Sequence, residues 1–228
     1  MGTLKVSNLC KTYIINKRQN NVLRNVNLTI KEGEMVGVMG PSGSGKTTLL
    51  YTVSGMDSAT AGRVEFYGKD LTGMKANEMS DIRLNEMGFV FQQMYMLKNL
   101  TVLDNIILPA VQSNKNTETR KEIVQRGQDL MRKLGIIEIA DNDINEVSGG
   151  QLQRACICCS MINNPKMIFA DEPTGALDSM TADEIMQIFE RLNMSGKTVI
   201  IVTHDKDIAA RCKRVIELSD GEIAKGTN

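Results

Sequence analysis

A glycine-rich segment with a single lysine lies between an apolar run and a helix-compatible run near residue 40. Gly40, four further residues, Gly45, Lys46 and Thr47 fit the pattern of a phosphate-binding loop. Backbone N–H groups freed by the glycines can point at a polyphosphate, and the following helix start adds a favourable dipole. We expect Lys46 to contact the β- and γ-phosphates and the Thr47 hydroxyl to coordinate Mg²⁺. A flexible Gly/Ser turn is the alternative, and the flanking strand and helix patterns disfavour it. The predicted nucleotide-binding residues are Gly40, Pro41, Ser42, Gly43, Ser44, Gly45, Lys46, Thr47 and Thr48.

Two adjacent carboxylates, Asp171 and Glu172, end the apolar stretch MIFADE. The carboxyl end of a buried strand is where α/β sheets bind ligands. Asp171 could hold Mg²⁺ through water, and Glu172 is the candidate general base that activates the attacking water. A pair of carboxylates that simply faces solvent is the alternative. Together with the phosphate loop, the pair predicts hydrolysis of a nucleoside triphosphate.

The stretch VSGGQLQR, residues 147–154, is a second candidate anion site. Ser148 can cap a helix that begins near Gln151, and Gly149 and Gly150 leave backbone N–H groups accessible. An SGG sequence alone is also typical of a plain capped loop. Its position, about 20 residues before the Asp-Glu pair, favours the functional interpretation.

The elements that must position these residues follow from apolar patterning. Short continuous apolar runs predict strands of a parallel sheet that helices cover on both faces. These runs are residues 35–39, 87–91, 167–170 and 198–202. Alternation at Val26, Leu28 and Ile30, and again at Val64 and Phe66, predicts antiparallel strands within the first 70 residues. The fold class is therefore α/β with an additional antiparallel part.

Helix and turn signals fill the remainder. Apolar spacing predicts a helix over 117–134 that Gly135 ends, and Thr181 with Glu184 forms a capping box ahead of another apolar stripe. Asp220-Gly221 predicts a tight hairpin turn. Residues 17–21 are interpreted as an enlarged polar turn.

Composition excludes several classes of protein. The 27 basic residues balance 27 acidic ones, so no overall charge favours a nucleic-acid partner. Apolar stretches fall far short of the roughly 20 residues that span a bilayer, and we expect no transmembrane segment. The five cysteines have no disulfide-scaffold spacing, which fits a reducing cytosol.

These motifs together resemble the ATP-binding cassette (ABC) ATPases over nearly the whole chain. The resemblance implies one cassette over 1–228, with a P-loop NTPase (RecA-like) core, an N-terminal antiparallel β subdomain and an inserted helical subdomain at about 93–163. It also implies ATP hydrolysis with Mg²⁺ in a homodimer that closes head to tail on two ATP molecules. The signature residues Ser148 to Gln151 of one copy then cover the γ-phosphate held by the other.

Further site residues come from the resemblance, position by position. Tyr13 corresponds to the aromatic residue that stacks on adenine, with an ordinary strand-surface tyrosine as the alternative. Gln92 corresponds to the residue that contacts Mg²⁺ or the water, and Gln93 replaces it if the register slips by one. Asp178 lies in the segment that crosses the dimer interface. His204, the single histidine, corresponds to the residue that contacts the γ-phosphate.

A subfamily is indicated by FVFQQ and by residues 100–109 and 168–179. They resemble ATPases of the lipoprotein-release, macrolide-export and antimicrobial-peptide systems, which serve separately encoded membrane permeases. The resemblance implies a cytoplasmic protein, peripheral on the inner face of the membrane, that drives transport of amphiphiles. Permease contacts are expected near residues 94–109, where Met94, Met96 and Leu97 form either a docking surface or core. The alternative is a non-transporting cassette that regulates a permease-like partner in cell-envelope or cell-division control.

One departure from the family pattern concerns the helix after the signature. Cys159 stands where family members usually carry an arginine, so that residue's ion pair is in doubt. Cys156 and Cys159 lie three residues apart, and a metal or redox pair is conceivable. Small buried side chains are favoured, because neither a second CxxC nor a nearby histidine completes a zinc site.

Overall fold

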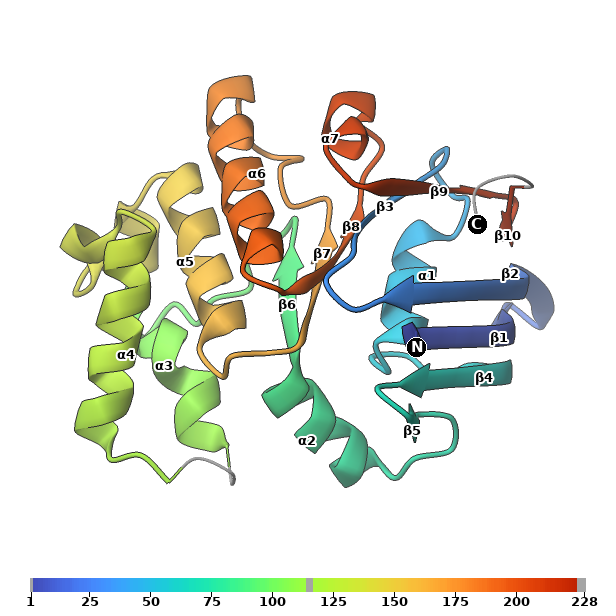
Figure 1. Ribbon diagram of the computed structural model, residues 1–228, viewed down its shortest axis with the longest axis horizontal. Coiled ribbons are helices and arrows are strands. Elements are labelled where there is room, and N and C mark those ends of the chain that lie inside the picture. The colour runs from blue at the N-terminus through green and yellow to red at the C-terminus, as the bar shows by residue number, and fades with distance from the viewer. Residues whose placement is uncertain (1, 114–116, 225–228) are drawn as a thin grey trace. The chain divides into compact units, whose positions relative to one another are not determined.

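The computed structural model describes residues 2–113 and 117–224, and its helices and strands are shown in Figure 1. Contacts between residues divide the chain into two compact units. The first unit comprises residues 1–80 and 193–228, and the second comprises residues 81–192. Helices α2 (Ala76–Glu86) and α6 (Ser179–Met194) run across the boundaries in sequence. In the described ranges, no helix has the length and apolar character needed to cross a membrane.

Parallel strands form one sheet of the first unit. Strand β3 (Met35–Met39) pairs in parallel with β8 (Thr198–Val202) on one side and β9 (Arg214–Ser219) on the other. Strand β8 is buried at every position, as its continuous apolar sequence predicts. Helices α1 (Lys46–Val53) and α7 (Lys206–Ala210) follow β3 and β8 in sequence. The short strand β10 (Glu222–Ile223) returns antiparallel to β9 through the predicted turn, where Asp220 and Gly221 have φ values of 48° and 80°.

The antiparallel sheet of the first unit has the order β2-β1-β4-β5. Its strands are β1 (Gly2–Ile15), β2 (Arg18–Lys31), β4 (Ala61–Phe66) and β5 (Lys69–Asp70). Val26, Leu28 and Ile30 point into the core as their alternation predicts.

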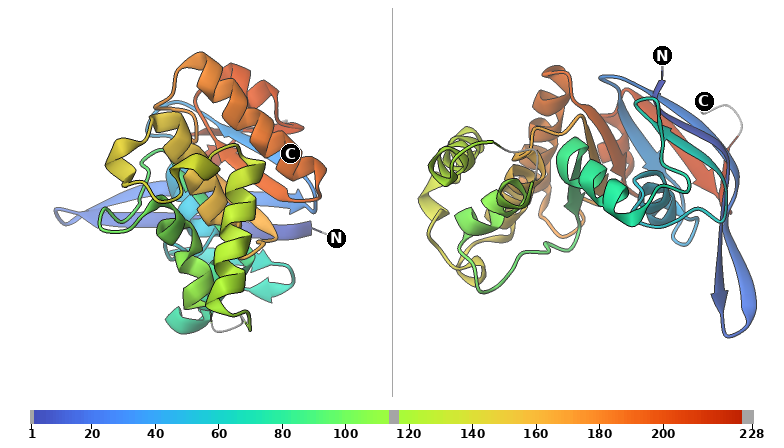
Figure 2. Two further views of the ribbon diagram at one scale, coloured as in Figure 1. Left: turned by 90° about the vertical axis from the view of Figure 1, so that its left-hand side faces the viewer. Right: turned by 90° about the horizontal axis from the view of Figure 1, so that it is seen from below.

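The enlarged polar turn expected at residues 17–21 is wrong. Asn16 and Lys17 alone form the turn, with φ values of 50° and 63°, and β2 already begins at Arg18. A two-residue loop with positive φ at both positions matches the twist of the flanking strands. The strands therefore continue almost to the tip of the long hairpin, which projects beyond the other strands of its sheet (Figure 2).

The second unit combines a parallel strand pair with a helical core. Strands β6 (Met87–Phe91) and β7 (Met167–Asp171) pair in parallel. Helices α3 (Val102–Gln112), α4 (Arg120–Lys133) and α5 (Gly149–Met161) pack on one another around buried side chains that include Ile106 and Met131. The 3₁₀ turns η1 (Ile137–Ile139) and η2 (Ile144–Glu146) connect α4 to α5. This core lies within the helical subdomain expected at about 93–163, whose boundaries stay a prediction.

The predicted helix over 117–134 is confirmed, whereas the predicted cap of the next apolar helix is wrong. The helix predicted over 117–134 is α4, capped by Thr119 and followed by Gly135 with a φ of 66°. The capping box expected at Thr181 and Glu184 is wrong, because α6 begins at Ser179 and Asp178 is its cap. The Asp178 carboxylate accepts the N–H groups of Met180 and Thr181 at 3.1 and 3.0 Å. Aspartate is itself a preferred N-cap residue, and here Asp178 caps α6 in place of Thr181.

The Thr119 cap of α4 gives a first testable prediction. Thr119→Ala should lower the free energy of unfolding by about 1 kcal/mol, because the N–H of Glu122 loses its acceptor. Denaturant unfolding monitored by circular dichroism measures this change, with Thr117→Ala, an exposed position outside the helix, as the matched control. Equal losses in the two variants would contradict the role of the cap.

The same cap carries a pH dependence. Hydrogen bonds from the Thr119 hydroxyl and N–H lower the pKa of Glu122 below its ordinary value. A carboxyl group with a lowered folded-state pKa stabilises the protein above its unfolded pKa, about 4.3 for glutamate. The difference in the free energy of unfolding between Thr119→Ala and the parent should therefore become smaller as the pH falls through the folded-state pKa of Glu122. Denaturant unfolding at a series of pH values measures this difference.

Candidate functional site

The phosphate loop of the first unit follows β3 and leads into α1. A Cβ added at Gly40 would collide with the carbonyl oxygen of Leu218, so the backbone path requires glycine there. Gly45 caps α1 with a φ of 100°, in the left-handed region that glycine favours. The Lys46 ammonium donates to the carbonyl oxygens of Gly40 and Pro41 at 2.8 and 3.0 Å. The loop therefore wraps around Lys46 at the N-terminal end of a helix.

The environment of Ser44 indicates whether this loop suits a polar ligand. Its hydroxyl oxygen is buried and has no hydrogen-bond partner among the described residues. Buried polar groups are rarely left unsatisfied, so an oxygen-rich ligand in the loop fits this site. Thr47, the residue expected to coordinate Mg²⁺, is exposed at the first turn of α1.

His204 reaches the same edge of the first unit's parallel sheet. Val38 on β3 lies opposite Val202 on β8, so the phosphate loop and His204 both leave the carboxyl ends of neighbouring strands. The His204 side chain is exposed, and the next residue, Asp205, caps α7. The topology thus brings together two predicted site segments that are more than 150 residues apart in sequence.

Glu172 and Gln92 are brought together within the second unit. Phe91 at the end of β6 lies opposite Asp171 at the end of β7, so the residues after them share one edge. A Cβ added at Gly175 would lie 3.0 Å from Gln92 Nε2 and 3.5 Å from Glu172 Cβ. Asp171 is buried, whereas Glu172 is half-buried and adopts a φ of 47°. A positive φ is rare outside glycine and is concentrated at functional sites.

The signature segment starts α5 as a capped helix. The Ser148 hydroxyl accepts the N–H of Gln151, and the Gln151 side chain accepts the N–H of Ser148. The cap is confirmed, although the helix begins at Gly149 rather than near Gln151. Beside it lies a pocket of about 530 Å³ in the second unit, lined by residues of α5 and its cap, by residues at and before the start of α6, and by Gly135 and Glu138 after α4.

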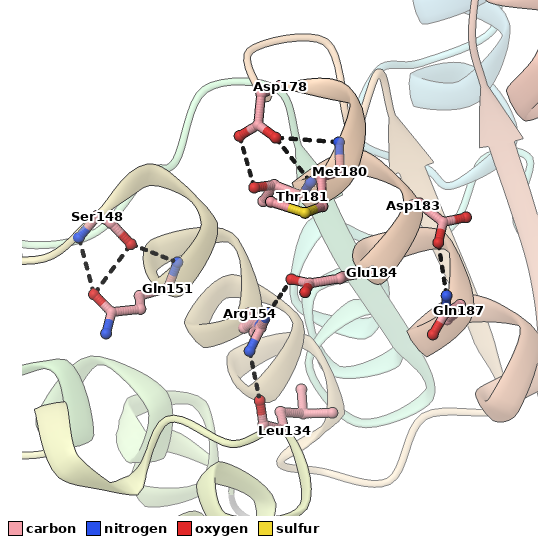
Figure 3. A network of polar contacts seen from close by, with 10 residues as sticks. All are labelled: Leu134, Ser148, Gln151, Arg154, Asp178, Met180, Thr181, Asp183, Glu184 and Gln187. Carbon is pink, nitrogen blue, oxygen red and sulfur yellow. Dashed lines mark hydrogen bonds and ion pairs between the residues drawn. The ribbon is translucent and has the colours of Figure 1, made fainter.

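Arg154, which lines this pocket, joins three elements through the polar contacts drawn in Figure 3. Its guanidinium donates to the carbonyl oxygen of Leu134 after α4 and forms an ion pair with Glu184 on α6. Asp178 caps α6, and hydrogen bonds from the Thr181 backbone and hydroxyl lower the pKa of its carboxyl group. The Arg154–Glu184 ion pair therefore connects the signature helix α5 with α6, the helix that Asp178 caps.

The sequence did not predict residues near the site that form hydrogen bonds or ion pairs with partners distant in sequence. Arg154 and Glu184 are 30 residues apart, and no local pattern pairs them. Lys11 and Asp57 contact Tyr13, with the Tyr13 hydroxyl donating to Asp57 at 2.6 Å. Only the spacing of Lys11 and Tyr13, two residues apart on a strand, could have indicated a shared face.

The cysteines of α5 differ in burial: Cys158 is buried in the core, whereas Cys156 and Cys159 are half-buried. Burial raises the pKa of Cys156 to about 12 and that of Cys159 to about 11, which disfavours the reactive thiolate. The Cys159 thiol donates to the carbonyl oxygen of Asn105 on α3 at 3.6 Å. Across the part of the chain that the structure describes, no three metal-binding side chains of the His, Cys, Asp and Glu types converge. Thr47 and Asp171 each offer oxygen atoms, the donors that Mg²⁺ prefers, and nucleotide or water oxygens would supply further ligands.

Gly150 provides the second testable prediction. A Cβ added there would lie 2.6 Å from Cγ2 of Thr181, whereas one at Gly149 has its nearest neighbour, Leu177, at 3.7 Å. Gly150→Ala should therefore lower the free energy of unfolding by about 1–3 kcal/mol through overpacking, and Gly149→Ala should not. Adding Thr181→Ser removes the clashing methyl group and should restore the stability of Gly150→Ala. Thermal unfolding of the three variants measures the effect, and failure of the rescue would contradict the contact.

Comparisons with known proteins agree with this geometry. Residues 23–175 match the model of the ABC transporter family. The macrolide export ATP-binding/permease protein MacB of Bartonella henselae is 41% identical over 222 residues, 97% of this chain and 33% of that protein. MacB of Mannheimia succiniciproducens is 37% identical over 227 residues, 100% of this chain and 35% of that protein. The chain thus spans about one third of the length of the curated relatives it matches.

Solved structures extend the similarity to the fold. The dimeric structure of MJ0796, a bacterial ABC transporter cassette, is 40% identical, with a TM-score of 0.91 and 97% of both chains covered. A post-hydrolysis state of the same cassette, bound to ADP and Pi, matches equally well. The predicted family and α/β fold class are confirmed: the chain belongs to the ABC transporter family and has the fold of its ATP-binding cassettes.

Proposed function

We propose that this cassette hydrolyses ATP to ADP and phosphate as a head-to-tail pair of copies, and thereby drives a membrane permease. The observation that carries the proposal is that one chain holds two capped helix starts suited to phosphate. One follows the loop wrapped around Lys46, and the other follows Ser148. Two such sites in one chain suit a nucleotide held between two copies. The dimeric structures of MJ0796 support this arrangement.

The chemistry assigned to the residues follows from their types and positions. Lys46 and the N–H groups of its loop stabilise charge on the transferred phosphoryl group. Glu172 accepts a proton from the attacking water, and Gln92 beside it orients that water. His204 contacts the γ-phosphate. When bound, Mg²⁺ would be held by Thr47, Asp171 and Gln92, and it would neutralise charge between the phosphates.

Contacts across the dimer complete the proposed site. Ser148, Gly149, Gly150 and Gln151 of one copy face the γ-phosphate held by the other, and Asp178 lies at the interface between the copies. Tyr13 stacks on adenine. The pocket of about 530 Å³ beside the signature helix is lined by residues proposed to lie at this interface, among them Ser148, Gly150 and Asp178.

The segment after Gln92 is the proposed contact with the permease. The buried Asn105 side chain fixes it, accepting the N–H of Leu97 at 2.7 Å and donating to the carbonyl oxygens of Leu97 and Thr101 at 3.0 Å. Met96 packs against the helical core, whereas Tyr95 and Leu97 expose 73% and 51% of their surface. Exposed apolar side chains on a fixed segment suit a protein contact. Of the three residues expected there, Met96 belongs to the core, whereas the half-buried Met94 and the exposed Leu97 remain candidates for docking, joined by Tyr95.

The relatives named above support a proposal for the transport system. The MacB proteins combine an ATP-binding part with a permease, and their names specify macrolide export. We propose that the present cassette serves a separately encoded permease of this kind, on the cytoplasmic face of the membrane. Amphiphiles such as antimicrobial peptides or lipoproteins are the proposed substrates.

Glu172→Gln tests the proposed hydrolysis. The amide cannot accept the water proton, so we expect hydrolysis to fall at least 100-fold while ATP binding persists. ATP should then accumulate a dimer, which size-exclusion chromatography separates from the monomer. Glu32→Gln, the same change at an exposed turn, should behave as the parent does. Full turnover by the Glu172 variant would remove this residue from its role.

Dependence on protein concentration tests the shared site. If a second copy supplies Ser148 and Gly150, specific ATPase activity should rise with protein concentration until dimers saturate. Steady-state assays over a hundredfold dilution series measure this rise. A specific activity that stays constant across the series, with the protein monomeric by light scattering, would exclude the shared site.

A further inference from the structure

Lys11 is a buried cation that the proposed chemistry does not use. Its side chain is only 8% exposed, and it lies on β1 two residues before Tyr13, on the same face of the strand. The ammonium donates to Asp57 Oδ1 at 2.6 Å and to the carbonyl oxygen of Ser58 at 2.7 Å. It also lies 4.7 Å from the centroid of the Tyr13 ring, within the range of a cation–π interaction.

Asp57 connects this ring to the phosphate-loop helix. Its second carboxylate oxygen accepts the Tyr13 hydroxyl at 2.6 Å, and its backbone N–H donates to the carbonyl oxygen of Tyr51 near the end of α1. The Tyr13 hydroxyl also interacts with the Thr48 side chain, which is in the first turn of α1. The tyrosine ring is therefore held by the same helix that begins with Lys46.

Electrostatics supports the same arrangement. Burial would raise the pKa of Asp57, but hydrogen bonds from Lys11 and Tyr13 outweigh it, and the pKa lies below its ordinary value. Burial and the neighbouring Asp57 carboxylate raise the pKa of the Tyr13 phenol, which stays protonated and keeps donating. Three groups thus satisfy one another, and removal of any one leaves a polar partner unsatisfied.

We propose that Lys11 and Asp57 are positioning residues for the nucleotide base. They hold the Tyr13 ring with one face against the ammonium, so that the opposite face receives the base at a fixed distance from the phosphate loop. The inference rests on the proposed function, in which Tyr13 stacks on adenine. Lys11 and Asp57 would then strengthen binding of the base without affecting binding of the phosphates to their loop.

Two probes separate the base from the phosphates. Mg²⁺-ATP carries both, whereas Mg²⁺ with inorganic triphosphate engages the phosphate loop alone. Isothermal titration calorimetry measures both affinities for Lys11→Met, Asp57→Asn and Tyr13→Ala. Lys11→Arg tests rescue by another cation, and Lys5→Met, an exposed lysine of the same strand, is the matched control.

We expect Lys11→Met and Asp57→Asn to weaken ATP binding about tenfold, as loss of an ordered stacking partner implies. Triphosphate affinity should change less than twofold, Lys11→Arg should recover most of the ATP affinity, and Lys5→Met should match the parent. Steady-state assays should show a raised KM with an unchanged kcat. If Lys11→Met does not fold because Asp57 loses its partner, the affinities of the Lys11→Met/Asp57→Asn double variant for ATP and triphosphate are compared with those of the parent instead.

Two results would overturn the proposal while leaving the proposed function intact. Equal weakening of ATP and triphosphate would show that Lys11 only maintains the structure. Unchanged ATP affinity in Lys11→Met and Asp57→Asn, alongside a loss in Tyr13→Ala, would show that the ring needs no support. A parent protein that binds ATP no better than triphosphate would instead remove the role of Tyr13 itself, and the inference with it.

Discussion

Parallel pairing with fixed register is the constraint on which the candidate site residues of each unit depend. In the first unit, Val38 opposite Val202 sets where the phosphate loop and His204 leave the sheet. In the second unit, Phe91 opposite Asp171 does the same for Gln92 and Glu172. These strands are apolar and buried, so a slip of one residue would turn a whole set of side chains to the wrong face. Polar site residues can then occupy short loops because the strands before them cannot shift.

Much of the fold was predictable because its signals are local. The apolar runs at 35–39, 87–91 and 198–202 are strands with those same bounds, and Ser148 caps its helix as its sequence indicates. The phosphate-loop pattern predicted a backbone that requires glycine. Gly40 confirms this, because its backbone lies against a carbonyl group that leaves no room for a side chain. Local patterns succeed where the residues that decide the conformation are neighbours in sequence.

The errors arose where two local signals competed or where contacts are distant in sequence. Asp178 and Thr181 are both good helix caps, and only the folded chain shows that Asp178 prevails. The polar residues after Lys17 resemble a loop, yet pairing with the end of β1 makes them a strand. The partners of Tyr13 and Arg154 lie 44 and 30 residues away, beyond any periodic signal. Such contacts depend on tertiary packing, which overrides local preference.

The long hairpin has a consequence for the dynamics of the cassette. Beyond Cys10, which faces Ala61, β1 pairs with β2 alone among the strands of the described residues. A two-stranded ribbon is marginally stable by itself, so side-chain contacts near its base must resist fraying. Tyr13 lies within this ribbon, between Cys10 and the exposed Ile14 and Ile15 near its tip, and its hydroxyl donates to Asp57. Force applied to the tip would therefore reach the aromatic ring before it reached the phosphate loop.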